Sequence, residues 1–192
     1  MRVGAELELK EDIEMWRKPT GQFTQQLIGA TLLVSVLFTA QPVQAACNAN
    51  MQQSTPTGQF TDHGDGTVTD DKTGLMWAQC AEGLSGSGCP PGSATTHTWQ
   101  AALDLAAAST HANYTDWRLP NLKELTSIVE ISCNNPAINA TIFPNTPGSH
   151  FWSASPYAND SGNAWGIYFG NGYDYYGSRS SSARVRLVRG GQ

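Results

Sequence analysis

Histidine, serine and glutamate side chains are the groups in this sequence that could support acid–base, nucleophilic or metal chemistry. The histidines form no H-E-x-x-H pair and the cysteines form no C-x-x-C pair, so the sequence predicts no metal site and no cofactor. Ser153 and Ser155 lack the flanking glycines of a hydrolase nucleophile. We expect Glu124 to cap a helix and Glu130 to lie six residues further along it, on another part of its surface. The sequence therefore predicts a protein that is not an enzyme. The four histidines are His63, His97, His111 and His150.

Aspartates near the start of the domain could also bind a cation. They lie in two turns rich in Asp and Gly, residues 62–66 and 70–74, which separate three predicted short strands. Gly64 occupies a ligand position of an EF-hand loop, so the spacing does not match such a loop. We expect these aspartates to form turns rather than a calcium site. The three strands are predicted around Phe60, at 67–69 and at 75–77.

The strongest local signal is DWRLPNLKELTSIVE, residues 116–130. Pro120 blocks a helix on its N-terminal side, Asn121 can cap, and Glu124 can reach back to the backbone N–H of the cap. A helix should therefore begin at Leu122. Its predicted buried stripe is Leu122, Leu125, Ile128 and Val129.

A second helix and several strands complete the predicted domain. Residues 98–109 are rich in alanine and can be capped by Thr98. From residue 151 onward the pattern alternates as in strands, with Trp165, Ile167 and Phe169 predicted on the core side. In the last strand Val185 and Leu187 should point one way and Arg184 and Arg186 the other. Strands followed by two helices and then more strands predict an α+β domain.

One hairpin is predicted near the C-terminus. If Asn171 and Gly172 form a two-residue turn, Tyr168 pairs with Tyr175 on the exposed face. That register turns Asp174 inward beside Phe169, so a bulged turn is the alternative.

The N-terminal region predicts export. Residues 27–40 are apolar and uncharged but too short to span a bilayer comfortably, and 43–45 form a small-residue cleavage pattern. We interpret residues 1–45 as an extension and signal peptide cleaved after Ala45. Because residues 1–14 are acidic and two basic residues follow Met15, Met15 is the expected true start. The alternative is a cytoplasmic tail on an anchoring helix. The expected location is periplasmic, cell-surface or secreted.

Four cysteines fall in the exported part, which suits an oxidising compartment. Cys80 and Cys89 flank a Gly/Ser-rich loop and are expected to pair, which leaves Cys47 to pair with Cys133. The alternative for Cys47 is lipidation, since the preceding residues partly resemble a lipoprotein processing site. For the cleaved chain, a lipid anchor is the membrane contact that this sequence suggests.

After cleavage the chain retains 11 acidic and 7 basic residues, a net charge of −4. Such a charge argues against nucleic acid as a partner. The bases gather near the C-terminus, so a local patch for anions is an open alternative. These bases are Arg179, Arg184, Arg186 and Arg189.

Several motifs in order resemble the bacterial DUF1566 family, also called the Lcl C-terminal domain family. They are GDGTVTDDKTGLMW, DWRLPNLKELTSIV, PAIN followed by FP, FWSASPY and VRLVRGGQ, and the similarity covers residues 59–192, after a linker or arm at 46–58. The RLP-then-helix segment and the closing RGG also look like the formylglycine-generating-enzyme branch of the C-type lectin fold.

That resemblance implies a C-type-lectin-like architecture. It has two helices, a small antiparallel sheet that closes the chain ends, and a second sheet that presents ligand-binding loops. It also implies surface adhesion and binding of sulphated glycans. The sequence lacks the Glu-Pro-Asn and Gln-Pro-Asp triplets of calcium-dependent lectins and the paired reactive cysteines of the sulfatase-activating enzyme. These absences weaken the case for calcium-mediated sugar binding and for that oxidase activity.

A second resemblance concerns residues 158–184, which contain no Lys, Glu, Gln or Met and are dominated by Gly, Ser, Tyr, Asn and Asp. This composition is similar to the variable regions of proteins diversified by retroelements. Randomising the adenines of AAY codons cannot produce Lys, Glu, Gln, Met or Trp. The lone exception, Trp165, falls at a position predicted to be core.

Tyrosine offers large contact area at low conformational cost, and Ser, Gly, Asn and Asp provide adaptable hydrogen bonds. We therefore predict a display face at about 157–184 that binds a surface protein or glycan. The alternatives are an ordinary polar loop, a fixed adhesin that binds sulphated glycans through Arg179, Arg184 and Arg186, and an enzyme of the formylglycine-generating type. The predicted ligand-binding residues are Tyr157, Asp160, Ser161, Gly166, Tyr168, Gly170, Tyr173, Asp174, Tyr175, Tyr176, Ser178 and Arg179.

Overall fold

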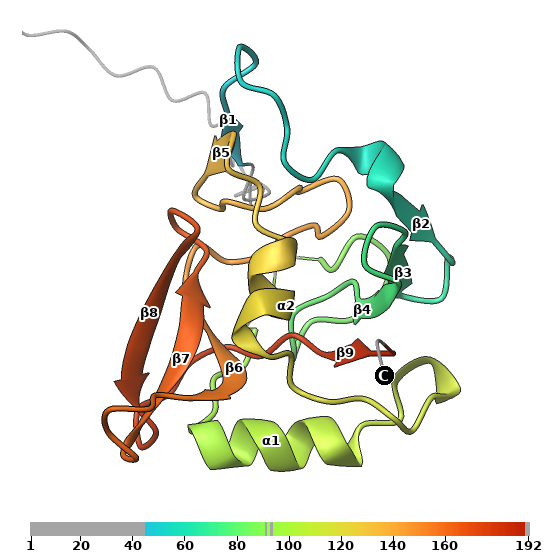
Figure 1. Cartoon of the computed structure of the whole chain (residues 1–192). Helices are drawn as coiled ribbons and strands as arrows, with labels where there is room; N and C mark the ends of the chain where they lie inside the picture. Colours follow the sequence, from blue (N-terminus) through green and yellow to red (C-terminus); the bar gives the residue numbers. More distant parts are fainter. Residues whose placement is uncertain (1–44, 91, 93, 191–192) are drawn as a thin grey trace, which may run out of the picture. The chain divides into compact units, whose positions relative to one another are not determined.

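Three antiparallel sheets and two α-helices make up the part of the chain described by the computed structural model, residues 45–90, 92 and 94–190 (Figure 1). All of these residues belong to one compact unit, 39–192. The α+β class with two helices and small antiparallel sheets is thus confirmed. The predicted signal peptide and the start at Met15 lie outside the described residues. No helix within the described range is long and apolar enough to cross a bilayer.

The sheets bring distant parts of the sequence together. One has the strand order β2-β3-β4-β9, a second β6-β7-β8, and a third pairs β1 with β5. The helices are α1 (Trp99–Ala108) and α2 (Leu122–Ser127). The strands are β1 (Ala46–Cys47), β2 (Phe60–Asp62), β3 (Thr67–Asp70), β4 (Leu75–Ala78), β5 (Cys133–Asn134), β6 (His150–Pro156), β7 (Asn163–Tyr168), β8 (Tyr173–Ser178) and β9 (Val188–Arg189).

The four-stranded sheet joins the two ends of the domain. The three strands predicted between Phe60 and Trp77 are confirmed as β2, β3 and β4. β9 then pairs with β4, with Trp77 opposite Val188, so the last described strand lies against one of the early strands of the domain. Trp77 and Val188 are both buried, and this pairing closes the core at one side.

α2 begins as predicted. The Asn121 side chain accepts a hydrogen bond from the Glu124 N–H at 2.9 Å, and the Glu124 carboxylate accepts one from the Asn121 N–H at 2.8 Å. The helix ends at Ser127, however, so the prediction that Glu130 lies on it is wrong. Val129 instead bridges to Ile138, and the Glu130 N–H donates to the carbonyl of Ala137.

α1 has the predicted extent, with Thr98 and Ser109 at its two cap positions, but the Thr98 side chain accepts no capping hydrogen bond. Ala102 and Ala106 are buried, and such small side chains allow the helix to approach β6 closely. The indole N–H of Trp99 donates to the carbonyl of Ser153 at 2.8 Å and fixes the start of the helix to that strand.

Two hydrophobic clusters fill the domain. One lies between the four-stranded sheet, α2 and the β6-β7-β8 sheet and includes Leu125, Ile128 and Phe151. The other lies beside α1 and includes Trp117 and Trp152. The β6-β7-β8 sheet therefore rests on both clusters along β6 and part of β7, whereas β8 lies at its outer edge (Figure 1).

Both predicted disulfides are present. Cys80 and Cys89 close a loop, and Cys47 is joined to Cys133 across 86 residues of sequence. Together they fit an oxidising compartment. The β1–β5 pair surrounds the longer-range bond, so it fixes residues 46–47 to the body of the domain.

Residues 46–58, predicted as a linker or arm, continue from there over a buried carboxylate. Glu130 is fully buried, and its oxygens accept hydrogen bonds from the N–H groups of Ser54, Thr55 and Ser132 at 3.1, 2.8 and 2.9 Å. The hydroxyls of Thr55 and Ser132 donate as well. Burial by itself raises the pKa of Glu130, but these donors outweigh it and lower that pKa to about 2.

This site predicts an acid-sensitive contribution to stability. The folded pKa of Glu130 lies below its usual value of 4.5, so the contribution is complete above that pH and is lost as the pH falls toward 2. Its size is at most about 3 kcal/mol. Glu130→Gln places an amide N–H against the Thr55 N–H, so we expect a loss of about 2 kcal/mol at pH 7. We also expect a flatter change in unfolding free energy between pH 4.5 and 2.5.

Denaturant unfolding at several pH values measures both effects. Asp174→Asn is the matched control, because it removes the same charge from an exposed site. Equal pH dependence in Glu130→Gln and in the unmodified protein would contradict the assignment.

Candidate functional site

The β7–β8 hairpin has a different register from the one predicted. Tyr168 lies opposite Tyr173, and Tyr175 lies opposite Gly166. The turn contains four residues, because Phe169 leaves the hairpin for the core, where it donates to Ser149 and accepts from Ala137. The predicted Tyr168–Tyr175 pair is therefore wrong.

Asp174 does not turn inward beside Phe169 as that register required. It lies opposite Ile167 on the edge strand, and its side chain is exposed.

One face of the sheet carries an aromatic group that we call the His150 cluster: His150, Trp152, Tyr168 and Tyr175. The His150 ring lies 4.6 Å from the Tyr168 ring and 4.1 Å from the Tyr175 ring, centroid to centroid. Trp152 lies 6.1 Å from Tyr175, with the two rings nearly parallel. Tyr173 stands on the same face at the end of the hairpin and is 72% exposed.

Tyr175 lies flat over Gly166, and this position fixes the cluster. A side-chain carbon at Gly166 would meet the carbonyl of Phe151 and would lie 2.7 Å from the Tyr175 ring. Burial of the Tyr175 hydroxyl, which has no partner among the described residues, raises its pKa. Gly166, predicted to contact ligand, is itself buried and supports the ring instead.

Tyr168 has a similar support. A side-chain carbon at Gly170 would collide with the Tyr168 ring, and the Gly170 carbonyl accepts from the Asn135 N–H at 2.9 Å. Gly170 therefore positions a tyrosine and holds the turn against the body of the domain.

The opposite face carries the Trp165 cluster: Tyr157, Trp165 and Tyr176. Tyr157 and Tyr176 stack with centroids 4.1 Å apart and planes 5° from parallel. Trp165 meets both rings edge-on, at 5.2 and 5.7 Å. Tyr176 is 53% exposed. The prediction that Trp165 is core is wrong, because it is half-buried and packs on these two tyrosines at the end of the sheet.

Some of the side chains predicted as polar ligand contacts already have partners within the domain, and others do not. Asp160 forms the turn before β7, since its carboxylate accepts from the Gly162 N–H and the Asn163 amide, both at 2.8 Å. Arg179 lies 4.1 Å over the Trp99 ring and donates to the Asn163 carbonyl. Ser161 and Ser178 are exposed.

The residues predicted to form one display face at about 157–184 thus lie on two opposite sides of one sheet. Sequence reasoning did not include His150 among the predicted ligand-binding residues. The available signal was its position two residues before Trp152, since residues two apart in a strand share a face. Partial burial between aromatic rings lowers the pKa of His150, which favours the neutral form.

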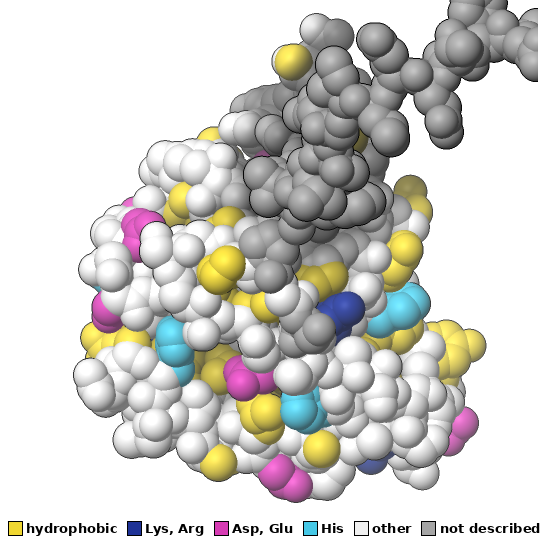
Figure 2. All heavy atoms as spheres, turned by 180° about the vertical axis from the view of Figure 1, so that it is seen from behind, with side chains coloured by type: hydrophobic (Ala, Val, Ile, Leu, Met, Phe, Trp, Pro, Cys, Tyr) yellow, Lys and Arg dark blue, Asp and Glu magenta, His cyan; other side chains and the backbone are white. Residues whose placement is uncertain are grey.

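Arg184 and Arg186, two of the C-terminal arginines, are engaged by acceptors of the domain itself. Arg186, predicted to point outward, is fully buried and donates to the carbonyl of Ala78 and the hydroxyl of Thr146. Arg184 is half-buried and donates to the carbonyl of Ala94. The prediction failed because Arg186 finds its acceptors inside the domain. On the face drawn in Figure 2, charged side chains lie singly among neutral ones.

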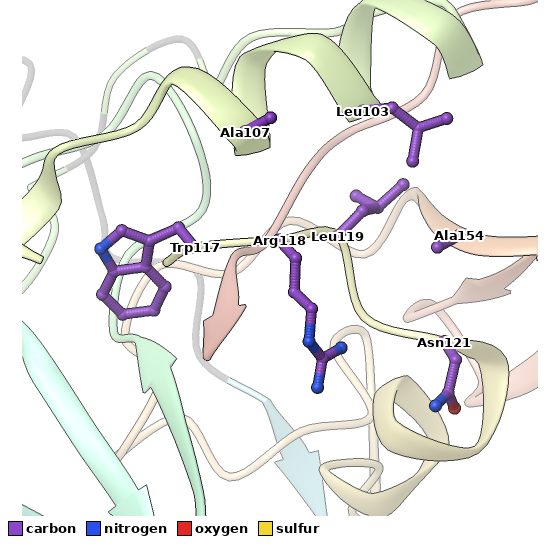
Figure 3. Close-up of a pocket in the computed structure, with 7 residues that line it drawn as sticks. All are labelled: Leu103, Ala107, Trp117, Arg118, Leu119, Asn121 and Ala154. Carbon is purple, nitrogen blue, oxygen red and sulfur yellow. The ribbon is translucent and has the colours of Figure 1, made fainter. Parts of the chain in front are cut away.

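Two cavities of about 350 Å³ lie away from the aromatic clusters. The first lies between α1 and residues 117–121, where Leu103 and Leu119 approach each other (Figure 3). Arg118 at its border is engaged by Glu124 at 2.7 Å. The second lies beside the turn at 62–66 and the Cys80–Cys89 loop.

The polar groups of the second cavity are engaged locally. Asp62 accepts from the Gly64 N–H, Asp65 accepts from Thr67, and His111 contacts the carbonyl of Gly66. In the described residues no three His, Cys, Asp or Glu side chains gather as a metal site.

Comparison with known families decides the classification. The model of the family described as the Lcl C-terminal domain matches residues 66–189. The chain belongs to this family. No curated protein matches it. The Lcl C-terminal domain therefore includes both aromatic clusters and every strand from β3 to β9.

The contact between Gly166 and Tyr175 yields a prediction for this Lcl C-terminal domain. Gly166→Ala should cost about 2–3 kcal/mol of unfolding free energy, since the added methyl has no room. Gly177→Ala is the matched control on the same face, where the nearest atom would lie 3.4 Å away, and should change stability by less than about 1 kcal/mol. Thermal and denaturant unfolding of both variants tests this, and similar losses would refute it.

Proposed function

We propose that this protein is an exported, non-enzymatic ligand-binding or adhesion protein that recognises its partner through the aromatic β6-β7-β8 sheet. The observation that carries the proposal is the pair of aromatic clusters on a sheet whose outer strand bears exposed tyrosines. Large exposed aromatic side chains in a group are characteristic of recognition surfaces. The partner class is a surface protein or a glycan.

The scaffold for this function is of the C-type-lectin type in our proposal. Two helices, a sheet that joins the chain ends and a second sheet at the side of the domain support it. In that arrangement the buried Trp77 and Trp117 support the core together with α2, whereas β8 contributes few buried side chains.

Diversification of the second sheet is part of the proposal. Within 158–184 the Tyr, Ser, Asn and Asp side chains are mostly outward: Asn159, Ser161, Tyr173, Asp174 and Tyr176 are exposed. The buried positions of the same segment are occupied by Ala, Gly, Ile and Phe. Such a division lets side chains at the edge change without loss of the core.

Recognition of sulphated glycans through arginines receives less support. Arg186 is buried, and Arg179 and Arg184 are each occupied by carbonyl oxygens. Engaged guanidinium groups would have to give up these contacts in order to bind a sulphate.

A double substitution tests the proposal. Tyr173→Ala with Tyr176→Ala should lower the unfolding free energy by no more than about 1 kcal/mol, because both rings are mainly exposed. Ligands found on a glycan array or in a displayed random-peptide library should bind this variant at least about tenfold more weakly.

Arg179→Ala is the control and should leave that binding unchanged, with little effect of raising the salt from about 0.1 M to about 1 M. Full binding by the double tyrosine variant would refute the proposal. Steep salt dependence together with loss in Arg179→Ala would favour the arginine alternative.

The genomic sequence tests diversification separately. We expect an adenine-rich near-copy of the codons for 158–184 close to the gene, together with a reverse transcriptase gene. Sequencing the locus from several isolates should then reveal differences concentrated at Tyr168, Tyr173, Tyr175 and Tyr176. If the near-copy and the reverse transcriptase gene are both absent, diversification is rejected and the proposal reduces to a binding surface of fixed sequence.

A further inference from the structure

β8 has an open backbone edge. In the described part of the chain β7 is the one strand that pairs with it. The Arg179 N–H donates to the Gly162 carbonyl at 2.8 Å, which marks a hydrogen-bonded pair at the end of the hairpin. Hydrogen-bonded and non-bonded pairs alternate along an antiparallel ladder. Asp174 and Tyr176 therefore direct their N–H and C=O groups away from β7, toward solvent.

This edge lacks the lysines, prolines and bulges that commonly prevent strand pairing. β8 has the sequence YDYYGS, and its register with β7 runs without interruption from Tyr168 to Asn163. The irregular pairing of this sheet lies on its other side, between Trp152 and Pro156 of β6. The one charge on β8 is the carboxylate of Asp174.

The aromatic clusters lie on both sides of this edge. Tyr173 and Tyr175 stand on the face of the His150 cluster, and Tyr176 stands on the face of the Trp165 cluster. A ligand that lies flat on one face contacts one cluster. An added strand contacts both, because its side chains alternate between the faces.

We infer that β8 binds an extended, basic polypeptide segment by strand addition, so that the partner becomes a fourth strand of the β6-β7-β8 sheet. This inference rests on the proposed function and narrows its partner class. Backbone pairing with Asp174 and Tyr176 supplies affinity independent of sequence, and the two clusters select the alternate side chains.

Charge indicates which side chains fit. Asp174 is exposed on the same face as Tyr176, so a lysine or arginine of the added strand can meet a carboxylate and an aromatic face there. Apolar or aromatic residues of the segment fit the Tyr173 and Tyr175 face. A second copy of this acidic chain is a poorer occupant of the edge, because its β8 would bring another Asp174 carboxylate rather than a basic side chain.

A backbone scan of the ligand tests the inference. Phage carrying random 12-residue peptides are selected on the disulfide-bonded protein, and the best peptide is synthesised with one N-methyl group at each position in turn. We expect methylation to weaken binding by about tenfold or more at every second residue and to have little effect between, because alternate N–H groups face β8.

A matched pair of variants tests the protein side. Tyr176→Pro and Tyr176→Ala both remove the ring, but proline also removes the outward N–H. An edge strand tolerates proline at such a position, so unchanged near-ultraviolet circular dichroism should verify folding. Peptide binding by Tyr176→Pro should be about tenfold weaker than by Tyr176→Ala.

Three results would overturn strand addition. They are an N-methyl scan without a period of two, recovery of glycan ligands with no peptide ligand, and a dimer whose dissociation by Tyr176→Pro identifies a second copy as the occupant. A flat scan for a peptide that still loses binding in the Tyr173→Ala, Tyr176→Ala variant would leave the proposed function standing. A flat scan together with full binding by the Tyr173→Ala, Tyr176→Ala variant would contradict both strand addition and the proposed function.

Discussion

Burial of the Arg186 guanidinium is the constraint around which the frame of this domain is arranged. The group is fully buried, and no acidic side chain among the described residues forms an ion pair with it. It donates instead to the carbonyls of Ala78 and Gln79 and to Thr146, and it lies 4.8 Å over the Phe143 ring. Burying a charge is costly unless it is hydrogen-bonded, and the Nε of this guanidinium has no partner among the described residues, so the contacts that it does make matter more. The end of β4, the loop at 143–146 and the segment before β9 must therefore keep their relative positions.

Glu130 is the complementary case, a buried anion satisfied by backbone and hydroxyl donors rather than by a base. Its donors come from the N-terminal arm and from the residues after α2. Arg186 and Glu130 hold different regions, and neither lies in β8. This separation explains how a well-determined core can coexist with an outer strand whose side chains make few internal contacts.

Local chemistry accounts for what the sequence predicted well. The Asn121–Glu124 capping box, the turns around β3 and the alanine face of α1 each depend on neighbours within a few residues. Global satisfaction of polar groups accounts for the errors. Arg186 alternates with apolar residues as an outward side chain would, and its acceptors more than 100 residues away leave no mark in the pattern. Phe169 likewise lengthened the hairpin turn because Ser149 and Ala137 offered it backbone partners in the core.

The bond between Cys47 and Cys133 has a mechanical consequence. Two residues beyond Cys133, the Asn135 N–H bonds to Gly170, and Ala137 bonds to Phe169, both in the β7–β8 turn. Tension applied between residue 47 and a ligand on the hairpin would pass through this covalent link and two short hydrogen bonds. The four-stranded sheet and most of the core lie outside that load path, so force would reach the hairpin without first unravelling the body of the domain.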